Sequence, residues 1–344
     1  MTNVLLDARK ARDFGIGRYV LGLLRALERR GEFRLSAVVF RDDAGLLPGG
    51  VTPVVSRAGP YTAGELVAVR SAIGRVKPDL FHAPHYVVPL FPPPSTVVTI
   101  HDLMHLSRPE HGSLPKRAYA TWMIGRAMRL SSRIITGSDA VRRELAGAFP
   151  ETSAKLVVIP HGVGPEFRGA TPAAGGAPYL LFLGNDKPHK NLDGLVSAFA
   201  ILRAARPGLR LLLAGVPTGR RAAPGVEALG FVPDAELPSL VAGAQTLVLP
   251  SFAEGFGLPV LEAQAAGTPV ACSDLPALRE AAGSEAVFFD PHAPESIARA
   301  VGGLLEDAAA QARLREAGLV RAAAFTWDRA AERTSAVYRE VLGR

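Results

Sequence analysis

The sequence predicts an α/β protein with two doubly wound parallel sheets, one in each half of its 344 residues. Short apolar runs recur along both halves, and each is followed by a segment with helical character. The runs are nearly continuous rather than alternating, which is typical of strands whose sheet is covered by helices on both faces. A chain of this length also suits two cores better than one. We therefore expect tandem domains, with ligands beyond the carboxyl ends of the strands and in a cleft between the domains.

Twelve apolar runs are the candidate strands. Those of the first half are at residues 4–8, 35–40, 79–84, 96–102, 133–138 and 156–162. Segment 169–178, GATPAAGGAP, then carries no charge and no periodicity, and its composition is typical of a linker. The second half repeats the rhythm at residues 179–184, 209–215, 228–232, 246–251, 269–274 and 286–290.

Composition limits the compartment and the chemistry. The single cysteine, Cys272, excludes an internal disulfide, and a small buried strand residue is a better interpretation of it than a nucleophile. The amino terminus turns charged after a very short apolar run, so we expect no signal peptide. No apolar run approaches the ~20 residues of a membrane-spanning helix. These features predict a cytoplasmic protein, or one peripheral to the inner face of a membrane.

Basic residues are concentrated in the first half. Residues 1–165 hold 22 Lys and Arg against 13 Asp and Glu, whereas the remainder holds 17 against 19. This asymmetry favours an anionic partner, which would be a phospholipid surface, a phosphorylated acceptor or nucleic acid. The alternative is an Arg-rich composition distributed by chance. Segment 114–133 carries five basic residues around Tyr119 and Trp122, so it either lies on an anionic membrane or buries its apolar face as an ordinary domain helix.

Two acids stand in the otherwise apolar stretch SFAEGFGLPVLEAQAAG. Residues 246–251 predict a strand, and Pro259 suits the first turn of a helix that ends near Gly267. We expect Glu262 in the first helical turn and Glu254 in the loop before it, so that both face one cleft and accept hydrogen bonds from sugar hydroxyls. The alternative is a helix N-terminal acid together with a solvated loop acid.

A basic loop follows the first strand of the second half, within LFLGNDKPHKNLDGLVSAF (181–199). The strand is expected to end at Gly184, and NLDGLVSAF is expected to be a helix. Lys187, His189 and Lys190 cluster between them, which favours a site for an anionic group. The alternative interpretation is a solvated cluster of loop charges.

Two further motifs follow strands of the first half. GIGRY follows the first strand and opens an amphipathic helix, although a G-x-G pattern by itself is a weak signal. Its Arg18 is either a phosphate contact or a surface charge. His101 ends the strand of residues 96–102. The pairs His101 with His105 and His82 with His85 lack a matching set of carboxylates or cysteines, so we expect no metal site.

Taken together, the E-x7-E pattern and the motifs around it closely resemble the retaining nucleotide-sugar glycosyltransferases of family 4, which have the GT-B fold of two Rossmann-like domains. The resemblance extends over essentially the whole chain. It implies an N-terminal acceptor-side domain at residues 1–165, a donor-binding domain at 166–326, and a terminal helix in 327–344 that packs back onto the first domain. It also implies no metal or other cofactor besides the nucleotide-sugar co-substrate.

The resemblance assigns roles to residues of the donor-binding half. In the family the first acid contacts hydroxyls of the donor sugar and the second holds the nucleotide ribose, which implies these roles for Glu254 and Glu262. The family places a lysine at the position of Lys190 and often an arginine near Asn185; this chain lacks that arginine, which leaves Lys187 as a substitute. Backbone N–H groups that would hold the diphosphate belong to Gly255, Phe256, Gly257 and Leu258.

In the first half, the resemblance implies that a glycine loop containing Gly15 and Gly17 approaches the diphosphate and the donor sugar. It implies that His101 approaches the primary hydroxyl of the donor sugar. Asp102 beside it is expected to orient that ring or to bind the acceptor.

The function implied is retaining transfer of a hexose from a nucleoside-diphosphate sugar to a saccharide or lipid-linked acceptor, with no nucleic-acid partner. GNDKPHKN and GIGRY most resemble bacterial mannosyltransferases of surface-polysaccharide assembly, so GDP-mannose is the first donor to consider. Alternatives on the same fold are a nucleotide-sugar epimerase, a phosphorylase and a non-catalytic nucleotide-sugar-binding protein.

Overall fold

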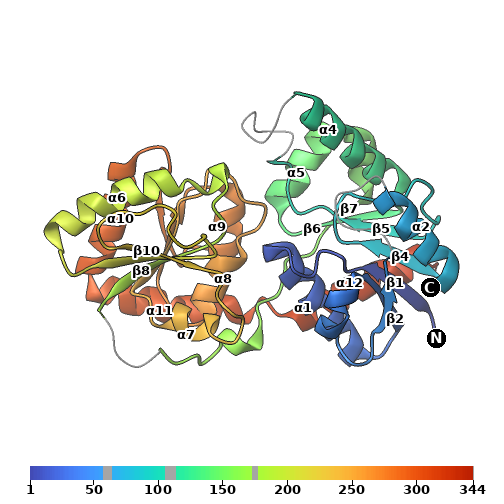
Figure 1. The fold of residues 1–344 in the computed structure, drawn as a ribbon, viewed down its shortest axis with the longest axis horizontal. Helices are drawn as coiled ribbons and strands as arrows, with labels where there is room; N and C mark the ends of the chain where they lie inside the picture. Colours follow the sequence, from blue (N-terminus) through green and yellow to red (C-terminus); the bar gives the residue numbers. More distant parts are fainter. Residues whose placement is uncertain (57–63, 105–113, 173–176, 344) are drawn as a thin grey trace. The chain divides into compact units, whose positions relative to one another are not determined.

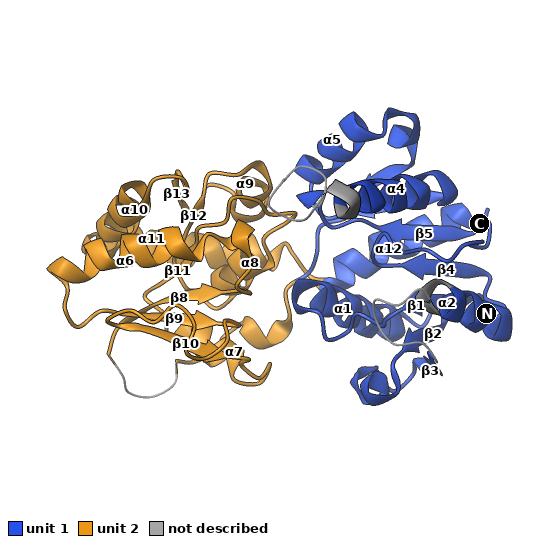
Figure 2. Ribbon diagram, turned by 45° about the horizontal axis from the view of Figure 1, so that its top comes forward, with its two compact units in different colours: residues 1–162, 327–344 blue, residues 163–326 orange. Residues whose placement is uncertain are grey.

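The computed structural model describes residues 1–56, 64–104, 114–172 and 177–343. The chain divides into two compact units (Figure 2). Unit 1 contains residues 1–162 and 327–344, and unit 2 contains residues 163–326. The α/β class expected from the sequence is observed in both units, since each contains one parallel sheet with helices on both faces (Figure 1).

The boundary between the units differs from the expected one. The described residues of segment 169–178 lie within unit 2 rather than between the units, so the prediction of a linker there is wrong. The chain enters unit 2 at residue 163, before the expected boundary after residue 165. The physical reason is Phe167, which ends the short 3-10 helix η4 (Pro165–Phe167) and is buried in the core of unit 2.

Unit 1 contains a seven-stranded parallel sheet with the order β3-β2-β1-β4-β5-β6-β7. The strands are β1 (Asn3–Asp7), β2 (Arg34–Val39), β3 (Thr52–Val55), β4 (Leu80–Ala83), β5 (Thr96–Thr99), β6 (Arg133–Thr136) and β7 (Leu156–Val158). Side chains of β1 alternate between two cores, with Val4 and Leu6 in one and Leu5 in the other. This alternation is what a sheet covered on both faces requires.

Helices of unit 1 complete these two cores. They are α1 (Phe14–Arg30), η1 (Arg41–Leu46), α2 (Gly64–Val76), α4 (Leu114–Leu130), α5 (Asp139–Ala148), η3 (Pro150–Lys155) and α12 (Trp327–Val341). Residues of α1 and α12 share one core, and residues of α2, α4 and α5 share the other. The carboxyl-terminal helix therefore belongs to unit 1 although the chain reaches it last.

Unit 2 contains a six-stranded parallel sheet with the order β10-β9-β8-β11-β12-β13. The strands are β8 (Tyr179–Leu183), β9 (Arg210–Ala214), β10 (Val226–Gly230), β11 (Thr246–Leu249), β12 (Val270–Ser273) and β13 (Val287–Phe289). The helices are η5 (Pro188–Lys190), α6 (Leu192–Ala205), α7 (Leu237–Ala242), α8 (Leu258–Ala265), α9 (Pro276–Ala282), α10 (Pro294–Glu306) and α11 (Ala308–Ala323).

The strand order reverses between β8 and β11 in unit 2. From β8 the chain moves outward through β9 to β10, and it then returns to the other side of β8 at β11. Ligands of open α/β sheets bind outside the carboxyl ends of the strands at such a reversal. The loops that follow β8 and β11 are therefore the first place in this unit to search for a site.

No helix within the described ranges is both long enough and apolar enough to cross a membrane.

Candidate functional site

The loops after β8 and β11 meet at the carboxyl edge of unit 2. The two strands are parallel neighbours, so both loops leave the same edge of the sheet. The backbone N–H of Phe252 donates to the carbonyl oxygen of His189 at 2.7 Å, which joins the second loop to the first. The two motifs singled out in the sequence are thus held together by the main chain.

An ion pair connects the same two loops. Lys190 Nζ donates to Glu254 Oε1 at 2.7 Å, and the Ser251 hydroxyl donates to the same oxygen at 2.6 Å. The side chains of Lys190 and Glu254 are only 12% and 8% exposed. Since both charges are largely removed from water, the pair is sensitive to loss of either partner. The structure therefore brings together the two residues to which the resemblance gives the sugar-contacting acid and the diphosphate-contacting base.

Asn191 fixes the end of the first loop, and the sequence motifs had not singled it out. Its backbone is left-handed at φ 53°, and its side-chain oxygen accepts the Gly194 N–H at 3.2 Å as the cap of α6. The side-chain amide donates to the carbonyl oxygens of Pro250 at 3.1 Å and Pro291 at 2.7 Å. An Asn directly before a helical segment is a capping signal, so the sequence contained a basis for noticing it.

The glycine-containing loop leads directly into α8. Gly257 has φ +105°, and a Cβ there would lie 2.7 Å from a side-chain carbon of Leu278. Phe256 and Leu258 on either side are 6% and 8% exposed and belong to the core. Gly257 therefore lets the chain turn sharply into the helix. Leu258 is the first residue of α8, so its N–H has no acceptor within the helix and can be donated to an anion.

Glu262 does not lie where the sequence analysis placed it. Helix α8 begins at Leu258, which puts Glu262 in the second turn, and no acidic residue occupies the first turn. Its side chain is buried, with 3% exposure. The expectation of a first-turn acid is therefore wrong, because the helix already begins at Leu258, directly after the left-handed Gly257, which is earlier than that expectation requires. The interpretation of Glu262 as an ordinary acid at the helix N-terminus also fails.

Lys187 is exposed at the outer side of the first loop. Its side chain makes no ion pair or hydrogen bond within the part of the chain that the structure describes. The charged group beside it is Asp186, which is bound by Arg220 and Arg221 from the loop after β9. These two arginines were not singled out in the sequence, because they follow no recognised motif.

His101 lies in unit 1, just beyond β5. Its Nε2 is 3.0 Å from the carbonyl oxygen of Pro84, and its Nδ1 is 3.3 Å from Nε2 of His161. Because a carbonyl only accepts, the proton is assigned to Nε2, and Nδ1 accepts from His161. Burial lowers the pKa of His101 to about 4, so the ring is neutral near pH 7. Both ring nitrogens are therefore engaged within unit 1.

Asp102 does not orient the His101 ring by a hydrogen bond within the described structure. Its carboxylate accepts the backbone N–H of Met104 at 3.0 Å, so it shapes the start of the next turn. The expected orienting role falls instead to Pro84 and His161. His105, considered with His101 as a metal pair, lies outside the described residues.

His82 and His85, the second histidine pair considered for a metal, contact different partners. His82 lies between Tyr338 Oη at 2.6 Å and Thr99 Oγ1 at 2.8 Å. His85 Nε2 lies 3.3 Å from the carboxylate of Asp7. Among the described residues, no cluster of three or more His, Cys, Asp and Glu side chains has the arrangement of a metal site.

Asp7 and Arg9 form a buried group that the sequence analysis did not identify. Arg9 makes a forked pair with the carboxylate of Asp7 at 2.8 and 2.6 Å. Although burial alone would raise the pKa of Asp7, Arg9 and His85 lower it far below its ordinary value. This fixed charge lies at the carboxyl end of β1, where the strand order of unit 1 reverses towards β4.

Gly15 and Gly17 lie in the first turn of α1, so GIGRY opens a helix as expected, but the two glycines do not lie in a loop as the resemblance implied. A Cβ at Gly17 would lie 2.3 Å from the carbonyl oxygen of Ala11. Gly17 therefore permits the turn before the helix to pack against its first turn. Gly15 is exposed, and a Cβ there would meet nothing within 4 Å.

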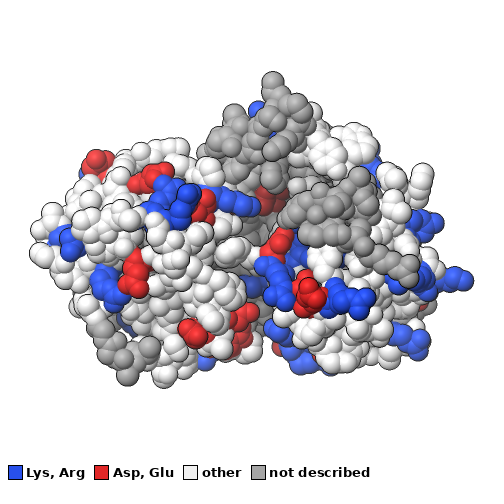
Figure 3. Space-filling model, viewed as in Figure 1, with Lys and Arg blue, Asp and Glu red and all other residues white. Residues whose placement is uncertain are grey.

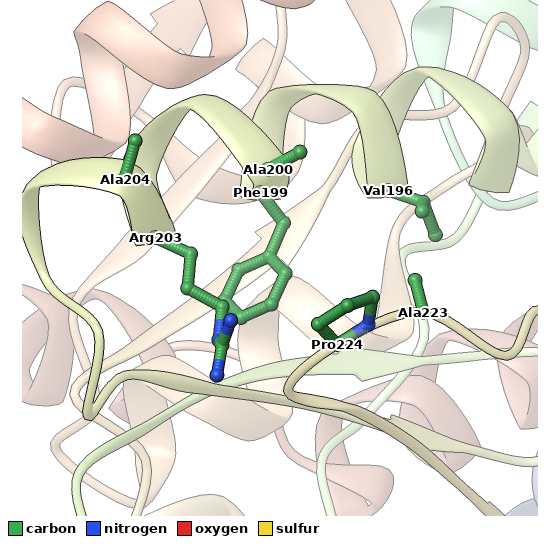
Figure 4. A pocket seen from close by; sticks show the side chains of 7 residues that line it. All are labelled: Val196, Phe199, Ala200, Arg203, Ala204, Ala223 and Pro224. Atoms are coloured by element: carbon green, nitrogen blue, oxygen red, sulfur yellow. The ribbon is translucent and has the colours of Figure 1, made fainter.

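A shallow hollow of about 250 Å³ lies elsewhere in unit 2, between α6 and the segment before β10 (Figure 4). Its lining is Val196, Phe199, Ala200, Arg203, Ala204, Ala223 and Pro224. Only Arg203 among these bears a charge, and the pocket is smaller than typical ligand sites. Its lining includes no carboxylate and neither Lys190 nor Glu254, so it is distinct from the site that those two residues form.

Cys272 is completely buried on β12, and burial raises the pKa of its thiol. This location agrees with a small core residue rather than a nucleophile.

Family models match both halves of the chain. Residues 15–167 match the model described as Glycosyltransferase Family 4, and residues 164–321 match Glycosyl transferases group 1. The two matches adjoin one another and together extend over nearly the whole chain.

Curated relatives include two kinds of bacterial glycosyltransferase. The chain is 28% identical over 291 residues to the O-antigen chain mannosyltransferase B of Escherichia coli, an alignment that covers 78% of this chain and 76% of that protein. It is 32% identical over 280 residues to the D-inositol 3-phosphate glycosyltransferase of Thermobispora bispora, covering 72% of this chain and 65% of the relative.

Solved structures share the fold over the full length. The sucrose-phosphate synthase of Thermosynechococcus elongatus superposes with a TM-score of 0.79 at 19% identity and covers 100% of both chains. WaaG, a glycosyltransferase involved in lipopolysaccharide biosynthesis, gives a TM-score of 0.79 at 16% identity over 97% of this chain and 99% of its own. The likeness identifies the fold as GT-B, with two Rossmann-like domains.

Proposed function

Because the chain belongs to the group 1 glycosyltransferases of family 4, and is therefore a glycosyltransferase that acts on nucleotide sugars, we propose that it transfers a hexose to a saccharide or lipid-linked acceptor. The observation that carries this proposal is the buried Lys190–Glu254 pair at the strand-order reversal of unit 2. It supplies one ammonium for phosphate oxygens and one carboxylate for sugar hydroxyls at the same edge of one sheet.

In the proposed reaction, the bond between the anomeric carbon and the phosphate oxygen breaks while the acceptor oxygen bonds to that carbon. Positive charge develops on the sugar, and negative charge develops on the leaving diphosphate. Lys190 and the N–H groups of residues 255–258 stabilise that negative charge. The acceptor hydroxyl gives its proton to a leaving phosphate oxygen. Donors fixed before the reaction are effective because they need no reorganisation, and one such donor is typically worth ~10²–10³ in rate.

Glu254 is proposed to accept hydrogen bonds from hydroxyls of the donor sugar. The Ser251 hydroxyl and Lys190 Nζ both hold Oε1, so Oε2 is the oxygen with room for a sugar hydroxyl. When a diphosphate binds, Lys190 has two further N–H donors for its oxygens without leaving Glu254. The ion pair and the substrate contacts are therefore compatible.

We also propose two more specific features of the reaction: it retains the anomeric configuration of the sugar, and its donor is GDP-mannose. Retention follows the character of the family stated above, and the similarity to an O-antigen chain mannosyltransferase supports mannose. Competing donors are UDP-sugars, since a protein of the same fold, Anabaena Alr3699/HepE, was solved with UDP-glucose. NMR of the anomeric position of the product distinguishes retention from inversion, because the new glycosidic bond fixes the anomer.

A donor panel tests the proposal. GDP-mannose, GDP-fucose, UDP-glucose, UDP-galactose and ADP-glucose are each incubated with the protein, with and without a mixture of mannosides and polyprenyl-linked saccharides. We expect nucleoside diphosphate release from one donor, increased by acceptor. Conversion of a donor sugar without acceptor would identify an epimerase instead. Binding without turnover on any acceptor would favour the non-catalytic alternative.

We also propose that transfer needs no metal. The Lys190 ammonium and the donors of residues 255–258 would take the role that a divalent cation has in other transferases. Transfer rates should therefore be unchanged by an excess of EDTA. A loss of activity that Mg²⁺ or Mn²⁺ restores would contradict this.

A peripheral contact with anionic membranes is proposed for unit 1. By sequence, unit 1 holds 26 Lys and Arg against 16 Asp and Glu, whereas unit 2 holds 13 against 16. Helix α4 buries Met123 and Ile124, as the ordinary interpretation expects, yet it leaves Tyr119 59% and Trp122 51% exposed. Exposed Tyr and Trp rings next to basic residues suit the interface between water and lipid.

A neighbouring loop extends this aromatic surface. Arg126, one turn after Trp122, donates to the carbonyl oxygens of Val88 at 3.1 Å and Pro89 at 2.6 Å, and also to that of Leu90. This holds beside α4 a loop whose Leu90 is 46% and Phe91 75% exposed. We define the apolar membrane patch as Leu90, Phe91, Tyr119 and Trp122.

Vesicle sedimentation tests the membrane contact. The protein should bind vesicles of phosphatidylglycerol more strongly than vesicles of phosphatidylcholine, and the variant Phe91→Ser/Trp122→Gln should lose most of that binding. Phe231→Ser is a matched control, because Phe231 is 80% exposed but belongs to unit 2. Equal binding by both variants would contradict the proposed contact.

A further inference from the structure

Arg220 and Arg221, in the loop after β9, both bind the carboxylate of Asp186 in the loop after β8. Arg220 approaches Oδ2 of Asp186 through Nε at 3.2 Å and Nη2 at 3.1 Å. Arg221 approaches Oδ1 through Nε at 3.1 Å and Nη2 at 2.8 Å. The Asp186 side chain is only 8% exposed. Although burial alone would raise the pKa of Asp186, hydrogen bonds from Arg221 and Arg220 lower it, so the carboxylate is charged.

These contacts join the loop after β9 to the loop that contains Lys187 and Lys190. Strands β8 and β9 are parallel neighbours, so their following loops leave the same edge of the sheet. Asp186 lies directly before Lys187, and Lys190 N–H donates to the Lys187 carbonyl oxygen at 2.9 Å in the same tight turn. The arginines therefore belong to the surroundings of the proposed phosphate-binding lysine.

Arg221 is the more buried of the two arginines that bind Asp186. It has φ +58°, a left-handed conformation that is unfavourable for a residue with a side chain. It is 26% exposed and pairs with Asp193 as well as with Asp186. Strained residues of this kind persist where their contacts hold them, and they are concentrated at ligand-binding positions.

Arg220 is the more exposed of the two arginines. Its side chain is 66% exposed, and its Nη1 has no hydrogen-bond partner within the described ranges. The fork on Asp186 nevertheless fixes the direction of the guanidinium plane. Arg220 thus presents unused N–H donors in a defined orientation at the carboxyl edge of unit 2.

Charges around this edge favour an anion. The charged residues of the three loops and the start of α6 are Asp186, Lys187, Lys190, Asp193, Arg220, Arg221 and Glu254. Four of these are cations and three are carboxylates. Acidic and basic side chains likewise adjoin one another at several places on the face seen in Figure 3. The net charge of these loops is therefore only slightly positive. The orientation of the N–H donors matters more for binding an anion than this net charge.

We propose that Arg220, positioned by Asp186 and braced by Arg221, is the second cationic contact for the diphosphate of the donor. It supplies a guanidinium from the loop after β9, which leaves the same edge of the sheet as the loop that contains Lys190. A planar guanidinium can bind two phosphate oxygens at once, which the Lys187 ammonium cannot. This inference rests on the proposed function, because it presumes a nucleoside-diphosphate donor.

Isothermal titration calorimetry tests the inference with GDP and UDP, and with GMP and UMP as single-phosphate comparisons. Arg220→Ala should weaken the better-binding diphosphate about tenfold, as loss of one charge-assisted contact predicts, and should weaken its monophosphate much less. Arg220→Lys should recover only part of the loss. Asp186→Asn should have the same selective effect, because it frees the guanidinium without removing it.

The matched control is Arg210→Ala. Arg210 is 39% exposed and pairs with Glu227 at 2.5 Å, but it lies at the amino end of β9 and thus away from the carboxyl edge. Its replacement should leave both affinities unchanged. Equal affinities of Arg220→Ala and Arg210→Ala for the diphosphate, or equal losses for mono- and diphosphate, would overturn the inference while leaving the proposed function intact.

Two further results decide the remaining cases. If the unaltered protein binds none of these four nucleotides, and neither ADP nor AMP, the proposed function fails and the role of Arg220 fails with it. Protection of the Cys272 thiol, which is buried in unit 2, reports whether each variant is folded. If Arg220→Ala is not protected, the same comparison is made with Arg220→Gln, which retains a polar side chain of similar length.

Discussion

Breaking the Lys190–Glu254 pair from one side should reduce the stability of unit 2 as well as activity. At 2.7 Å and an effective dielectric constant of 20, the Coulomb attraction is about 6 kcal/mol. Desolvation offsets much of this, and removing one partner of a buried pair typically costs about 3–5 kcal/mol. We expect about 3 kcal/mol for Lys190→Ala, at the lower end because Glu254 keeps its hydrogen bond from Ser251.

The double variant Lys190→Met/Glu254→Gln separates stability from activity. It removes both charges and keeps the volume nearly constant, so the free energy of unfolding should return to within about 1 kcal/mol of the original protein. Transfer activity should stay at least ~10²-fold reduced, because the ammonium is still missing. Lys190→Ala alone should be defective in both respects.

The single cysteine provides the assay for stability. Cys272 is buried in the core of unit 2, and unit 1 contains no cysteine, so the rate of thiol labelling in urea measures the opening of unit 2 alone. Arg206→Met is the control, since Arg206 pairs with a Glu306 side chain that is 72% exposed and should contribute under 1 kcal/mol. If the double variant is as unstable as Lys190→Ala, the instability of Lys190→Ala does not come from an unpaired Glu254 charge. If the double variant has unchanged turnover, Lys190 has no role in transfer.

Three further predictions concern the stability of the two units. Burial lowers the pKa of His82 to about 3 and of His101 to about 4, and lowers that of His161 as well, so the unfolded chain binds more protons below pH 6.5. Stability should therefore fall by about 3–4 kcal/mol between pH 7 and pH 5.5 in urea titrations that follow unit 1, and His161→Phe should show a smaller fall. Gly257→Ala should destabilise unit 2 by more than about 1 kcal/mol, since φ is +105°; unchanged protection of Cys272 would contradict this. Asn191→Ala should cost about 2 kcal/mol by the same assay, whereas Asn191→Asp, which keeps the helix cap, should lose less.

Local sequence patterns predicted most of the fold. Continuous apolar runs identified all strands but one, because strands buried on both faces leave a simple signal. The strand missed was β3 (Thr52–Val55), which has only four residues, contains Pro53 and lies at the edge of its sheet. Strand β10 was expected at 228–232 and is observed at Val226–Gly230.

Candidate site residues were harder to position, because their geometry depends on contacts between distant segments. Lys190 and Glu254 were singled out separately, but their ion pair joins residues 64 positions apart and has no local signature. Glu262 was placed one turn too early, since the left-handed Gly257 sets the start of the helix. Arg220 and Arg221 belong to a polar loop without a motif, and only the fold brings them to Asp186.

Phosphorus NMR of a nucleoside diphosphate bound to the protein tests the central claim most directly. Upon titration with the unaltered protein, both phosphorus resonances of the preferred nucleotide should shift and broaden, because Lys190 and the amides of residues 255–258 contact its phosphates. With Lys190→Met/Glu254→Gln under the same conditions, the shifts should be largely lost. Resonances that stay unmoved with the unaltered protein, or that shift equally with the double variant, would contradict the account.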